Sequence, residues 1–313
     1  MVGIRDIANK AEVSISTVSY ALNGSPRVSE ATRKRILDIA NEMNYIPNMA
    51  GQNLRRQNTN IIAVYLSSYQ GTFYSELLES MNKQANELGL ELIVCSGQRS
   101  HLFLPQKMID GILVLDMTYS NEELIKYANM GYPIVLLDRE LNHDKIRSVL
   151  LNNKSGTREA MYSLIDKKVT KIFVISGPAN NHDSAERTKA AIDVANKYSI
   201  DYEIIEGNFN EKSGYEAAER MTIGKSECVG IFALNDEMAL GAFNYIKEDS
   251  NISINDVYIH GFDKIQVTQY LNPRIQSVSY SKEDWGQIAV ETLDKLIKGT
   301  PVENHIIPTY FEN

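Results

Sequence analysis

Cysteine is scarce in this sequence, which has only Cys95 and Cys228 in 313 residues. Both lie inside apolar runs and no CxxC pair occurs, so the chain has neither a disulfide framework nor a cysteine metal motif. We expect two buried free thiols. No apolar stretch approaches the ~20 residues that span a bilayer, and the opening MVGIRDIANKAEV has no apolar core of a signal peptide. We therefore expect a cytoplasmic protein without a membrane segment.

Catalytic motifs are also missing from the sequence. The five histidines are scattered, and none belongs to an HExxH motif or to another ligand spacing. No P-loop, GxGxxG or GxSxG occurs. Carboxylates are plentiful, but nothing marks a pair of them as catalytic. We expect no enzymatic activity, no catalytic residue, no metal and no cofactor.

Basic charge is concentrated at the N-terminus. Residues 1–60 carry eight Lys or Arg against five Asp or Glu, a net charge of +3. The rest of the chain has a net charge of −11, which gives the total of −8. A basic segment attached to an acidic body is typical of a small DNA-binding domain. A solvated basic surface would give the same count, so charge alone does not decide.

Apolar spacing predicts three short helices in residues 1–46. The first has one apolar face formed by Ile4, Ile7, Ala8 and Ala11. Ser14 is a good N-cap for a second helix that runs to about Leu22 and turns Val18 and Ala21 to the core. Ser29 caps a third helix whose stripe is Ile36, Ile39, Ala40 and Met43. Two short helices separated by a tight turn and followed by a longer one indicate a helix-turn-helix.

The outward face of the second helix is unusually uncharged. It holds Ile15, Ser16, Thr17, Ser19 and Tyr20. Small polar side chains at the start of such a helix suit contact with base edges in the major groove. The sequence therefore predicts a sequence-specific DNA-binding domain.

The string DIANKAEVSISTVSYALNG, followed by VSEATRKRILDIANEMNYIPN, resembles the DNA-binding domain of LacI/GalR repressors. The resemblance implies that Ile15, Ser16 and Tyr20 carry base specificity, whereas Thr17 and Ser19 bind phosphates. It also implies DNA contacts from Asn23 and from Asn48.

Two positions depart from the family's pattern. The family commonly has arginine where Tyr20 stands, and a tyrosine cannot read guanine bidentately, so we expect an atypical operator at that base pair. Packing of Tyr20 on the DNA backbone is the alternative. Glu12 replaces the small residue or glycine usual in the turn, where a positive φ would strain it unless the turn differs slightly.

Residues 47–59 form the link to the rest of the chain. Their polar sequence, PNMAGQNLRR from Pro47 to Arg56, favours a flexible linker on composition alone. The resemblance instead implies a hinge helix that orders on DNA, with Leu54 as a wedge in the minor groove and Arg55 beside it. Gly51, where the family usually has alanine, should raise the cost of ordering this helix by about 1 kcal/mol.

From residue 60 onward short apolar runs alternate with helical stretches. The runs expected as strands are 61–66, 90–95, 111–116, 133–138, 171–176, 228–234, 257–262 and 275–279. Continuous apolar strands between helices indicate parallel sheets covered on both faces. The expected fold class is therefore α/β, with the helix-turn-helix head (1–46) and hinge (47–59) joined to a core (60–313) of two doubly wound lobes. The N-lobe takes about 60–151 and 282–309, and the C-lobe about 152–281.

Polar side chains stand where these strands end, and ligands of such folds bind beyond the carboxyl ends. They are Asp138, Arg187, which opens the helix after the 177–186 loop, Asn235 and Asp263. Singly, each fits a cap or a turn. Together with ALNDEMALGA (233–242) they resemble the periplasmic-binding-protein-like core of the LacI/GalR family, which implies that they bind the effector. Carboxylate, guanidinium and amide groups suit a sugar.

Four aromatic residues fall at matching cleft positions and would stack on the apolar faces of a sugar ring, although filling the core explains each equally well. They are Phe73, Tyr74, Phe209 and Tyr280. The segment between residues 96 and 110 is shorter than in most of the family, so we expect a shortened loop and a more open cleft. The C-terminal IIPTYFEN holds no leucine heptad, so we expect a two-fold homodimer rather than a coiled-coil tetramer.

These features predict a transcriptional repressor of carbohydrate-use genes. Its affinity for a near-palindromic, double-stranded operator would be controlled by a small sugar or sugar phosphate bound between the lobes. The same DNA-binding role under a protein corepressor or a non-sugar metabolite is the alternative. An exported sugar receptor would share the core but would not carry the DNA-binding head.

Overall fold

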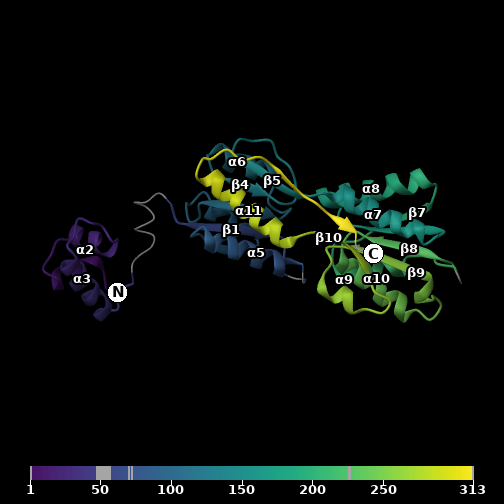
Figure 1. The fold of residues 1–313 in the computed structure, drawn as a ribbon, viewed down its shortest axis with the longest axis horizontal. Coiled ribbons are helices and arrows are strands. Elements are labelled where there is room, and N and C mark those ends of the chain that lie inside the picture. The colour runs from purple at the N-terminus through teal and green to yellow at the C-terminus, as the bar shows by residue number, and fades with distance from the viewer. Residues whose placement is uncertain (1, 47–57, 70, 72, 225–226, 312–313) are drawn as a thin grey trace. The chain divides into compact units, whose positions relative to one another are not determined.

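The computed structural model describes residues 2–46, 58–69, 71, 73–224 and 227–311 (Figure 1). The chain divides into two compact units, Met1–Asn58 and Thr59–Asn313. The predicted hinge residues Asn48, Gly51, Leu54 and Arg55 lie outside the described residues. Within the described part, no helix is both long and apolar enough to cross a bilayer.

The N-terminal unit contains the three predicted helices. They are α1 (Ile4–Lys10), α2 (Ile15–Leu22) and α3 (Glu30–Glu42). The Ser14 and Ser29 side chains accept hydrogen bonds from the backbone N–H of Thr17 and of Thr32, so both predicted N-caps are confirmed. The helices enclose a small core whose buried members are Ile7, Ala8, Ala11, Val18, Ala21, Val28, Ile36 and Ala40.

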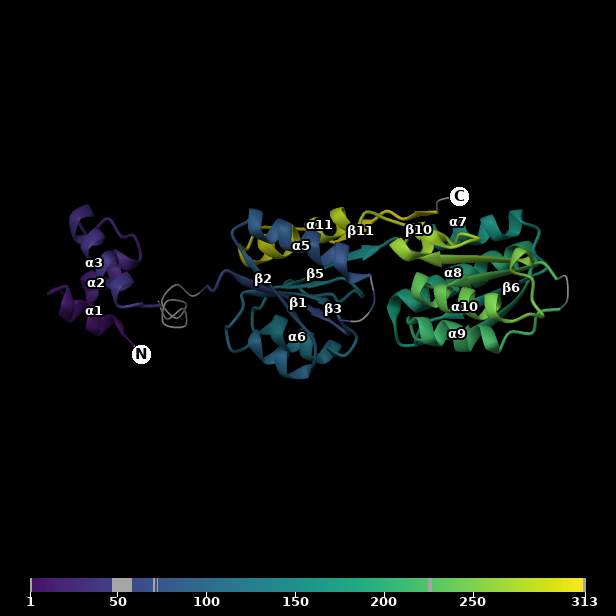
Figure 2. The same ribbon diagram turned by 90° about the horizontal axis from the view of Figure 1, so that it is seen from below.

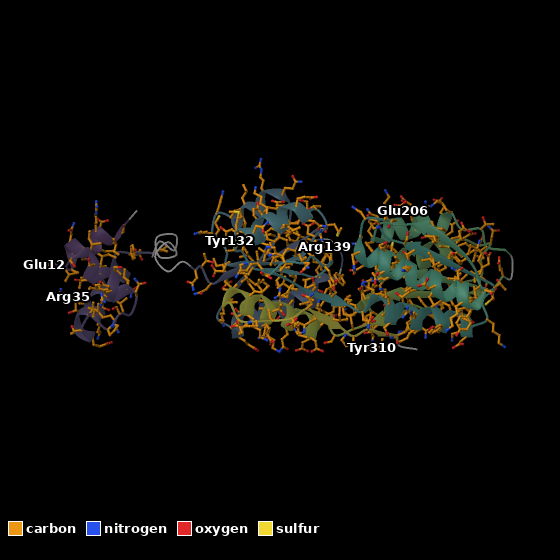
Figure 3. All side chains as sticks on the ribbon, turned by 90° about the horizontal axis from the view of Figure 1, so that it is seen from above. Glu12, Arg35, Tyr132, Arg139, Glu206 and Tyr310 are labelled. Carbon is orange, nitrogen blue, oxygen red and sulfur yellow. The ribbon has the colours of Figure 1, made fainter. Side chains whose placement is uncertain are left out.

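Glu12, in the turn between α1 and α2, has a φ of 50°. This is the left-handed conformation that a non-glycine residue adopts at a cost of about 1–2 kcal/mol. Arg35 of α3 holds the turn from the other side, because its Nη2 donates to the Ala11 carbonyl at 2.6 Å; both side chains are labelled in Figure 3. The strained geometry expected for Glu12 is confirmed.

The N-lobe is built on a six-stranded, all-parallel sheet with the order β11-β5-β4-β3-β1-β2. Its strands are β1 (Ile61–Leu66), β2 (Glu91–Cys95), β3 (Gly111–Leu115), β4 (Ile134–Leu136), β5 (Ile146–Leu151) and β11 (His305–Ile307). Helices α5 (Tyr74–Glu87) and α11 (Lys282–Ile297) lie on one face and α6 (Asn121–Asn129) on the other (Figure 2). The 96–110 segment, predicted to be shortened, contains a 3-10 helix, η1 (Gln98–Phe103).

The C-lobe repeats this plan with the order β12-β10-β9-β8-β6-β7, in which only β12 is antiparallel. Its strands are β6 (Lys171–Ser176), β7 (Asp201–Glu206), β8 (Val229–Ala233), β9 (Val257–Phe262), β10 (Gln276–Ser279) and β12 (Tyr310–Phe311). Its helices are α7 (Asn153–Asp166), α8 (His182–Tyr198), α9 (Glu211–Glu219) and α10 (Asp236–Glu248), with short 3-10 turns at η2 (Ile254–Asp256) and η3 (Gln266–Tyr270). Figure 1 shows α7 and α8 on one face of the sheet and α9 and α10 on the other.

Both lobes therefore have the doubly wound strand order 2-1-3-4-5. In such sheets the connections after the two central strands run in opposite directions, which opens a crevice between them. Ligands bind in this crevice, at the carboxyl ends of the strands. The crevice lies after β1 and β3 in the N-lobe and after β6 and β8 in the C-lobe. These four strand ends are therefore the positions at which the strand order predicts a ligand.

The eight predicted strands are present, but four further strands were not predicted. Strand β7 (DYEIIE) lies at a sheet edge, and exposed acidic side chains mask its apolar pattern. In β5 (IRSVLL) the charged Arg147 interrupts the apolar run. Strands β11 and β12 have three and two residues, too short for a periodic signal. Both cysteines are free, but Cys228 is only half-buried because it lies just before the first residue of β8.

Candidate effector cleft and DNA-reading face

The outward face of α2 holds the predicted DNA contacts. Ile15, Ser16 and Tyr20 are exposed, whereas Thr17 and Ser19 are half-buried. The Thr17 hydroxyl lies 2.8 Å from the Ser14 hydroxyl, so part of its hydrogen-bonding capacity is used inside the helix. Asn23 ends α2 and donates from Nδ2 to the Ser19 carbonyl at 2.7 Å. The face is uncharged and open to a partner, as base contact requires.

Asp138 follows β4 and is buried beside Arg139. Arg139 Nε and Nη2 donate to the two carboxylate oxygens at 2.9 and 2.8 Å. The same guanidinium donates to the carbonyls of Tyr119 and Asp116, which fixes its position; Arg139 is labelled in Figure 3. Burial raises the pKa of Asp138 although Arg139 lowers it. A carboxylate has about four lone-pair sites, so Asp138 retains acceptors for a ligand.

Arg187 is buried in the second turn of α8. The expectation that it opens this helix is wrong, because Asn181 caps the helix and it begins at His182. Arg187 Nε donates to Asn153 Oδ1 at 2.8 Å and Nη1 to the Leu234 carbonyl at 2.7 Å. Its Cζ lies 3.5 Å from the centroid of the Phe262 ring. The guanidinium is thus held rigidly before any ligand binds.

Asn235 caps α10, because its Oδ1 accepts from the Met238 N–H at 3.0 Å. Its Nδ2 donates to the Phe209 carbonyl at 3.0 Å. Phe209 has a φ of 55°, which strains an aromatic residue. Its ring lies so close to Gly177 that a Cβ there would come within 2.4 Å of Phe209 Cζ. Asn235 therefore has a structural role and also positions the Phe209 loop at the end of β7.

Asp263 and Tyr280 form a buried pair at the ends of β9 and β10. The Tyr280 hydroxyl donates to Asp263 Oδ1 at 2.9 Å. Lys282, also buried, donates from Nζ to the Asp263 carbonyl at 2.9 Å and pairs with Glu76 of α5 at 3.1 Å. Since Lys282 and Glu76 belong to the N-lobe and Asp263 to the C-lobe, this lysine links the two lobes beside the predicted site.

Two of the predicted aromatic residues, Phe73 and Tyr280, lie beside Trp285, the only tryptophan of the chain. The Trp285 ring centroid lies 5.7 Å from that of Tyr280 and 6.4 Å from that of Phe73, which contacts Tyr74 edge-to-face at 5.0 Å. These distances are those of stabilising aromatic pairs. They form one wall next to Asp263, whereas Phe209 stands apart near Asn235.

The cleft is acidic. Burial, together with Asp116, Asp263 and Glu237, raises the pKa of the Tyr74 hydroxyl to about 12. Burial raises the pKa of the Asp263 carboxyl from 3.8 to about 6, although Arg187 and Lys282 lower it. Carboxylates therefore dominate the electrostatics around Tyr74, and they favour a neutral ligand over an anionic one.

Several polar side chains of the cleft were not predicted. Asp116 follows β3, and Ser67 Oγ and the Thr118 N–H donate to its Oδ1 at 3.1 and 2.9 Å. Among the described residues, its Oδ2 is buried without a hydrogen-bond partner. An unpaired buried acceptor is costly unless a ligand or water satisfies it. Its position after an apolar run is the same signal that identified Asp138.

Asn153, Asp183 and Lys282 were also missed. Asp183 Oδ1 accepts from Asn153 Nδ2 at 2.7 Å, and Asp183 Oδ2 lies 3.8 Å from Arg187 Nη2. Asn153 follows β5, a strand that the sequence did not predict. Lys282 is the first residue of α11, just after β10, where a lysine resembles any exposed helix residue. No group of three or more His, Cys, Asp or Glu side chains in the described part of the chain could hold a metal ion.

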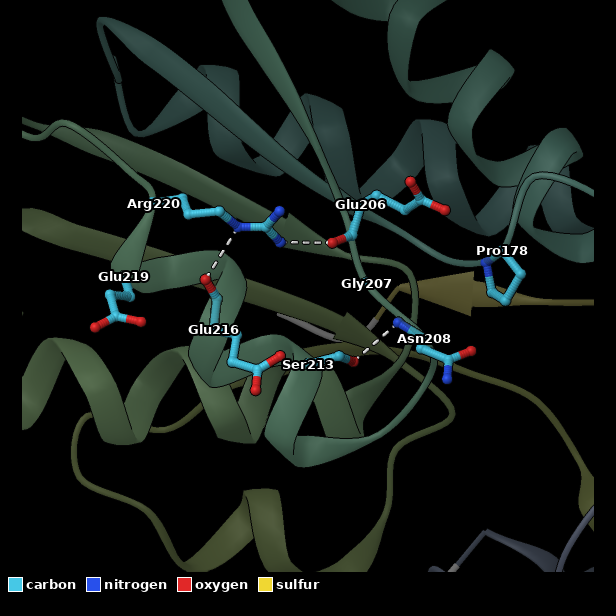
Figure 4. Close-up of a pocket in the computed structure, with 8 residues that line it drawn as sticks. All are labelled: Pro178, Glu206, Gly207, Asn208, Ser213, Glu216, Glu219 and Arg220. Carbon is cyan, nitrogen blue, oxygen red and sulfur yellow. Dashed lines mark hydrogen bonds between the residues drawn. The ribbon is translucent and has the colours of Figure 1, made fainter.

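A separate pocket of about 550 Å³ opens at the ends of β7 and α9 (Figure 4). Arg220 crosses it, with Nη2 donating to the Glu206 carbonyl and Nε to the Glu216 carbonyl. Its lining has three glutamates and no aromatic side chain. Because no aromatic side chain lines it, this pocket offers no stacking surface for a sugar. It also contains none of the predicted effector residues.

Two family models match this chain. The one described as bacterial regulatory proteins, lacI family, matches residues 3–48, and the one described as a periplasmic binding protein domain matches residues 62–301.

Known proteins resemble the chain over most of its length. The ribose operon repressor of Haemophilus influenzae is 30% identical over 318 residues, covering 97% of this chain and 94% of that protein. A sugar-binding transcriptional regulator of the LacI family from Enterococcus faecalis is 40% identical, with a TM-score of 0.77, and the match covers 82% of this chain and 97% of that one. The lac repressor dimer bound to operator and the anti-inducer ONPF matches with a TM-score of 0.82 over 100% of this chain and 98% of that one. At 23% identity, this last likeness shows the fold alone.

Proposed function

The chain belongs to the LacI family and is a DNA-binding transcriptional repressor, and we propose that a small neutral sugar bound between its lobes controls its affinity for operator DNA. It regulates by binding and not by catalysis. The genes it represses are, on this proposal, genes of carbohydrate use.

The observation that carries the sugar proposal is the arrangement around Asp263. The buried Asp263 carboxylate accepts from Tyr280, whose ring belongs to an aromatic wall with Trp285 and Phe73. The rigid guanidinium of Arg187 acts on the same carboxylate and lowers its pKa. Polar groups that bridge neighbouring hydroxyls, beside a ring that stacks on an apolar sugar face, are what a sugar requires. The regulator from Enterococcus faecalis, described as sugar-binding, adds support.

The charges of the cleft favour a neutral sugar over a sugar phosphate. Four carboxylates raise the pKa of Tyr74, and Arg139 is already paired with Asp138. A phosphate would bring about two negative charges into an acidic, poorly solvated site. Of the two effector classes predicted from the sequence, we therefore retain the neutral sugar.

We propose that the protein acts as a homodimer on a near-palindromic operator, because a two-fold dimer of helix-turn-helix heads reads two half-sites. The lac repressor dimer, which is bound to operator, has the same fold. In this proposal Ile15 and Ser16 contact base edges, while Thr17, Ser19 and Asn23 fix the register. Asn48, Leu54 and Arg55 remain proposed contacts of the linker. Sugar binding draws the lobes together around the Lys282 bridge and lowers operator affinity.

A ligand screen tests the effector class. A ligand that binds the folded state raises the melting temperature by mass action, and Trp285 in the aromatic wall should change its fluorescence on binding. We expect one or more neutral sugars to raise the melting temperature and to alter this fluorescence, whereas sugar phosphates and sugar acids do neither. If no sugar produces either signal, the sugar proposal is wrong and a protein corepressor or non-sugar metabolite takes its place.

Effector affinity should depend on pH through Asp263. Its pKa is raised by burial to about 6, so the carboxyl is neutral below this pH and ionised above it. The ionised form accepts hydrogen bonds from sugar hydroxyls, so we expect affinity to fall as pH drops from 7 to 5 and to level off above pH 7. The stability of the free protein should change with pH in the opposite direction. Because the pKa of Asp263 is higher in the folded state, protonation of this carboxyl stabilises the fold, fully below about pH 4, and this stability is lost as pH rises through about 6. Titration calorimetry across this range, with Asp263→Asn as the control, measures the first effect; a flat wild-type profile would contradict it.

A further inference from the structure

The turn that follows α2 is held in place at both ends. The Ser25 N–H donates to the Tyr20 carbonyl at 2.9 Å, and Arg33 Nη2 donates to the Ser25 carbonyl at 2.7 Å. Val28, at the far end of the turn, is buried in the core of the N-terminal unit. Only Pro26 and Arg27 lie between these anchors, so the backbone that carries Arg27 has little freedom.

The Arg27 side chain lies on Tyr20. Its Nη1 donates to the Tyr20 hydroxyl at 2.9 Å, and its Cζ is 5.3 Å from the centroid of the ring. Both contacts are favourable for a guanidinium beside an aromatic hydroxyl. Tyr20 lies on the outward face of α2 with Ile15, and both side chains are exposed. The contact therefore places the guanidinium beside the face of α2 that holds the predicted base contacts.

The chemistry of the pair assigns different roles to its members. Tyrosine has a single hydroxyl, and here that hydroxyl already accepts from Arg27. Arginine has five N–H donors in a planar fork, and Tyr20 uses one of them. Among the described residues, Arg27 takes part in none of the ion pairs of the N-terminal unit. Its remaining donors are therefore available to a ligand outside the chain.

We propose that Arg27, held by Tyr20, reads a guanine in each operator half-site through its O6 and N7 atoms, and that Tyr20 is a positioning residue. The inference rests on the DNA-binding role of α2. A fixed guanidinium meets guanine with little further loss of conformational freedom, which favours bidentate contact. The atypical operator expected from Tyr20 would then reflect base contact by Arg27, which Tyr20 holds in place.

Selection of bound DNA from a random pool by the full-length protein, repeated with variants, tests the proposal. In Arg27→Lys the charge remains but the planar fork is lost, so the preference for guanine at one position per half-site should fall about tenfold. In Arg27→Ala the same preference falls and the salt dependence weakens. In Tyr20→Phe the ring remains without the hydroxyl, so the loss is smaller and confined to the same position. Lys34→Ala, which removes an exposed positive charge from α3, should leave all base preferences unchanged.

Two results would overturn the proposal. If Arg27→Lys keeps every base preference, or if Arg27→Ala weakens binding to all sequences alike, Arg27 contacts phosphate and reads no base. If the wild-type protein itself selects no site from the pool, the DNA-binding role of α2 fails and the proposal fails with it. Selection by the wild type followed by unchanged selection by the Arg27 variants would refute the proposal alone.

Discussion

Replacing Ile36 by alanine is expected to unfold the N-terminal unit and to abolish operator binding, while the melting of residues 59–313 stays unchanged. Ile36 is fully buried among only eight buried apolar residues. Truncating such a side chain destabilises by about 2–5 kcal/mol. A unit of 58 residues has a total stability of about 3–9 kcal/mol at ordinary values per residue. The substitution therefore removes most of what holds this unit together.

Leu37 provides the matched control, because it is the next residue of α3 and is 40% exposed. Leu37→Ala should leave operator binding and both melting transitions nearly unchanged. Differential scanning calorimetry and a filter-binding assay measure the two effects. Operator binding retained in Ile36→Ala, or loss of the transition of residues 59–313, would show that the two units do not fold as described.

Replacing Arg187 by methionine is expected to weaken the response to the effector on the order of 100-fold or more while operator binding persists. Methionine keeps an apolar side chain of similar length against Phe262, but it removes the donors that now bind Asn153 and the Leu234 carbonyl. A site that hydrogen-bonds hydroxyl groups loses much of its affinity when one charged partner is removed. The repressor should then stay on its operator at sugar concentrations that release the wild type.

Arg220→Met is the matched control for this substitution. Arg220 donates to two backbone carbonyls, but it is exposed and lies in the pocket of Figure 4, which holds no predicted effector residue. It should bind sugar and operator as the wild type does. An Arg187→Met protein that folds, binds operator and still responds at the wild-type sugar concentration would exclude Arg187 from the site.

The ends of the buried parallel strands can be predicted well from the sequence, because burial on both faces restricts which residues such strands contain. Parallel strands buried on both faces must be continuous apolar runs, so the residue that follows each run is easy to find. Asp138, Asn235 and Asp263 were located in this way, and the structure places each just after a strand. The same rule would have found Asp116, which follows β3.

Contacts between distant parts of the chain could not be predicted. Lys282 reaches Glu76, 206 positions earlier in the chain, and nothing in either local sequence indicates this pair. The partner of Asp138 is its neighbour Arg139, but an alternating strand pattern would place adjacent side chains on opposite faces. The contact between Tyr20 and Arg27 could not be predicted either, because it depends on the shape of the turn between α2 and α3.

The measurement that tests the central claim most directly is the affinity of the effector for the protein with and without operator. Titration calorimetry would use the neutral sugar that raises the melting temperature most, first with the free protein and then with the protein bound to its selected operator. Because coupling between two ligands is reciprocal, we expect the sugar to bind the operator complex about 5–150-fold more weakly, by the same factor by which it lowers operator affinity. Equal affinities in the two titrations would contradict the claim that the cleft controls the DNA-binding head.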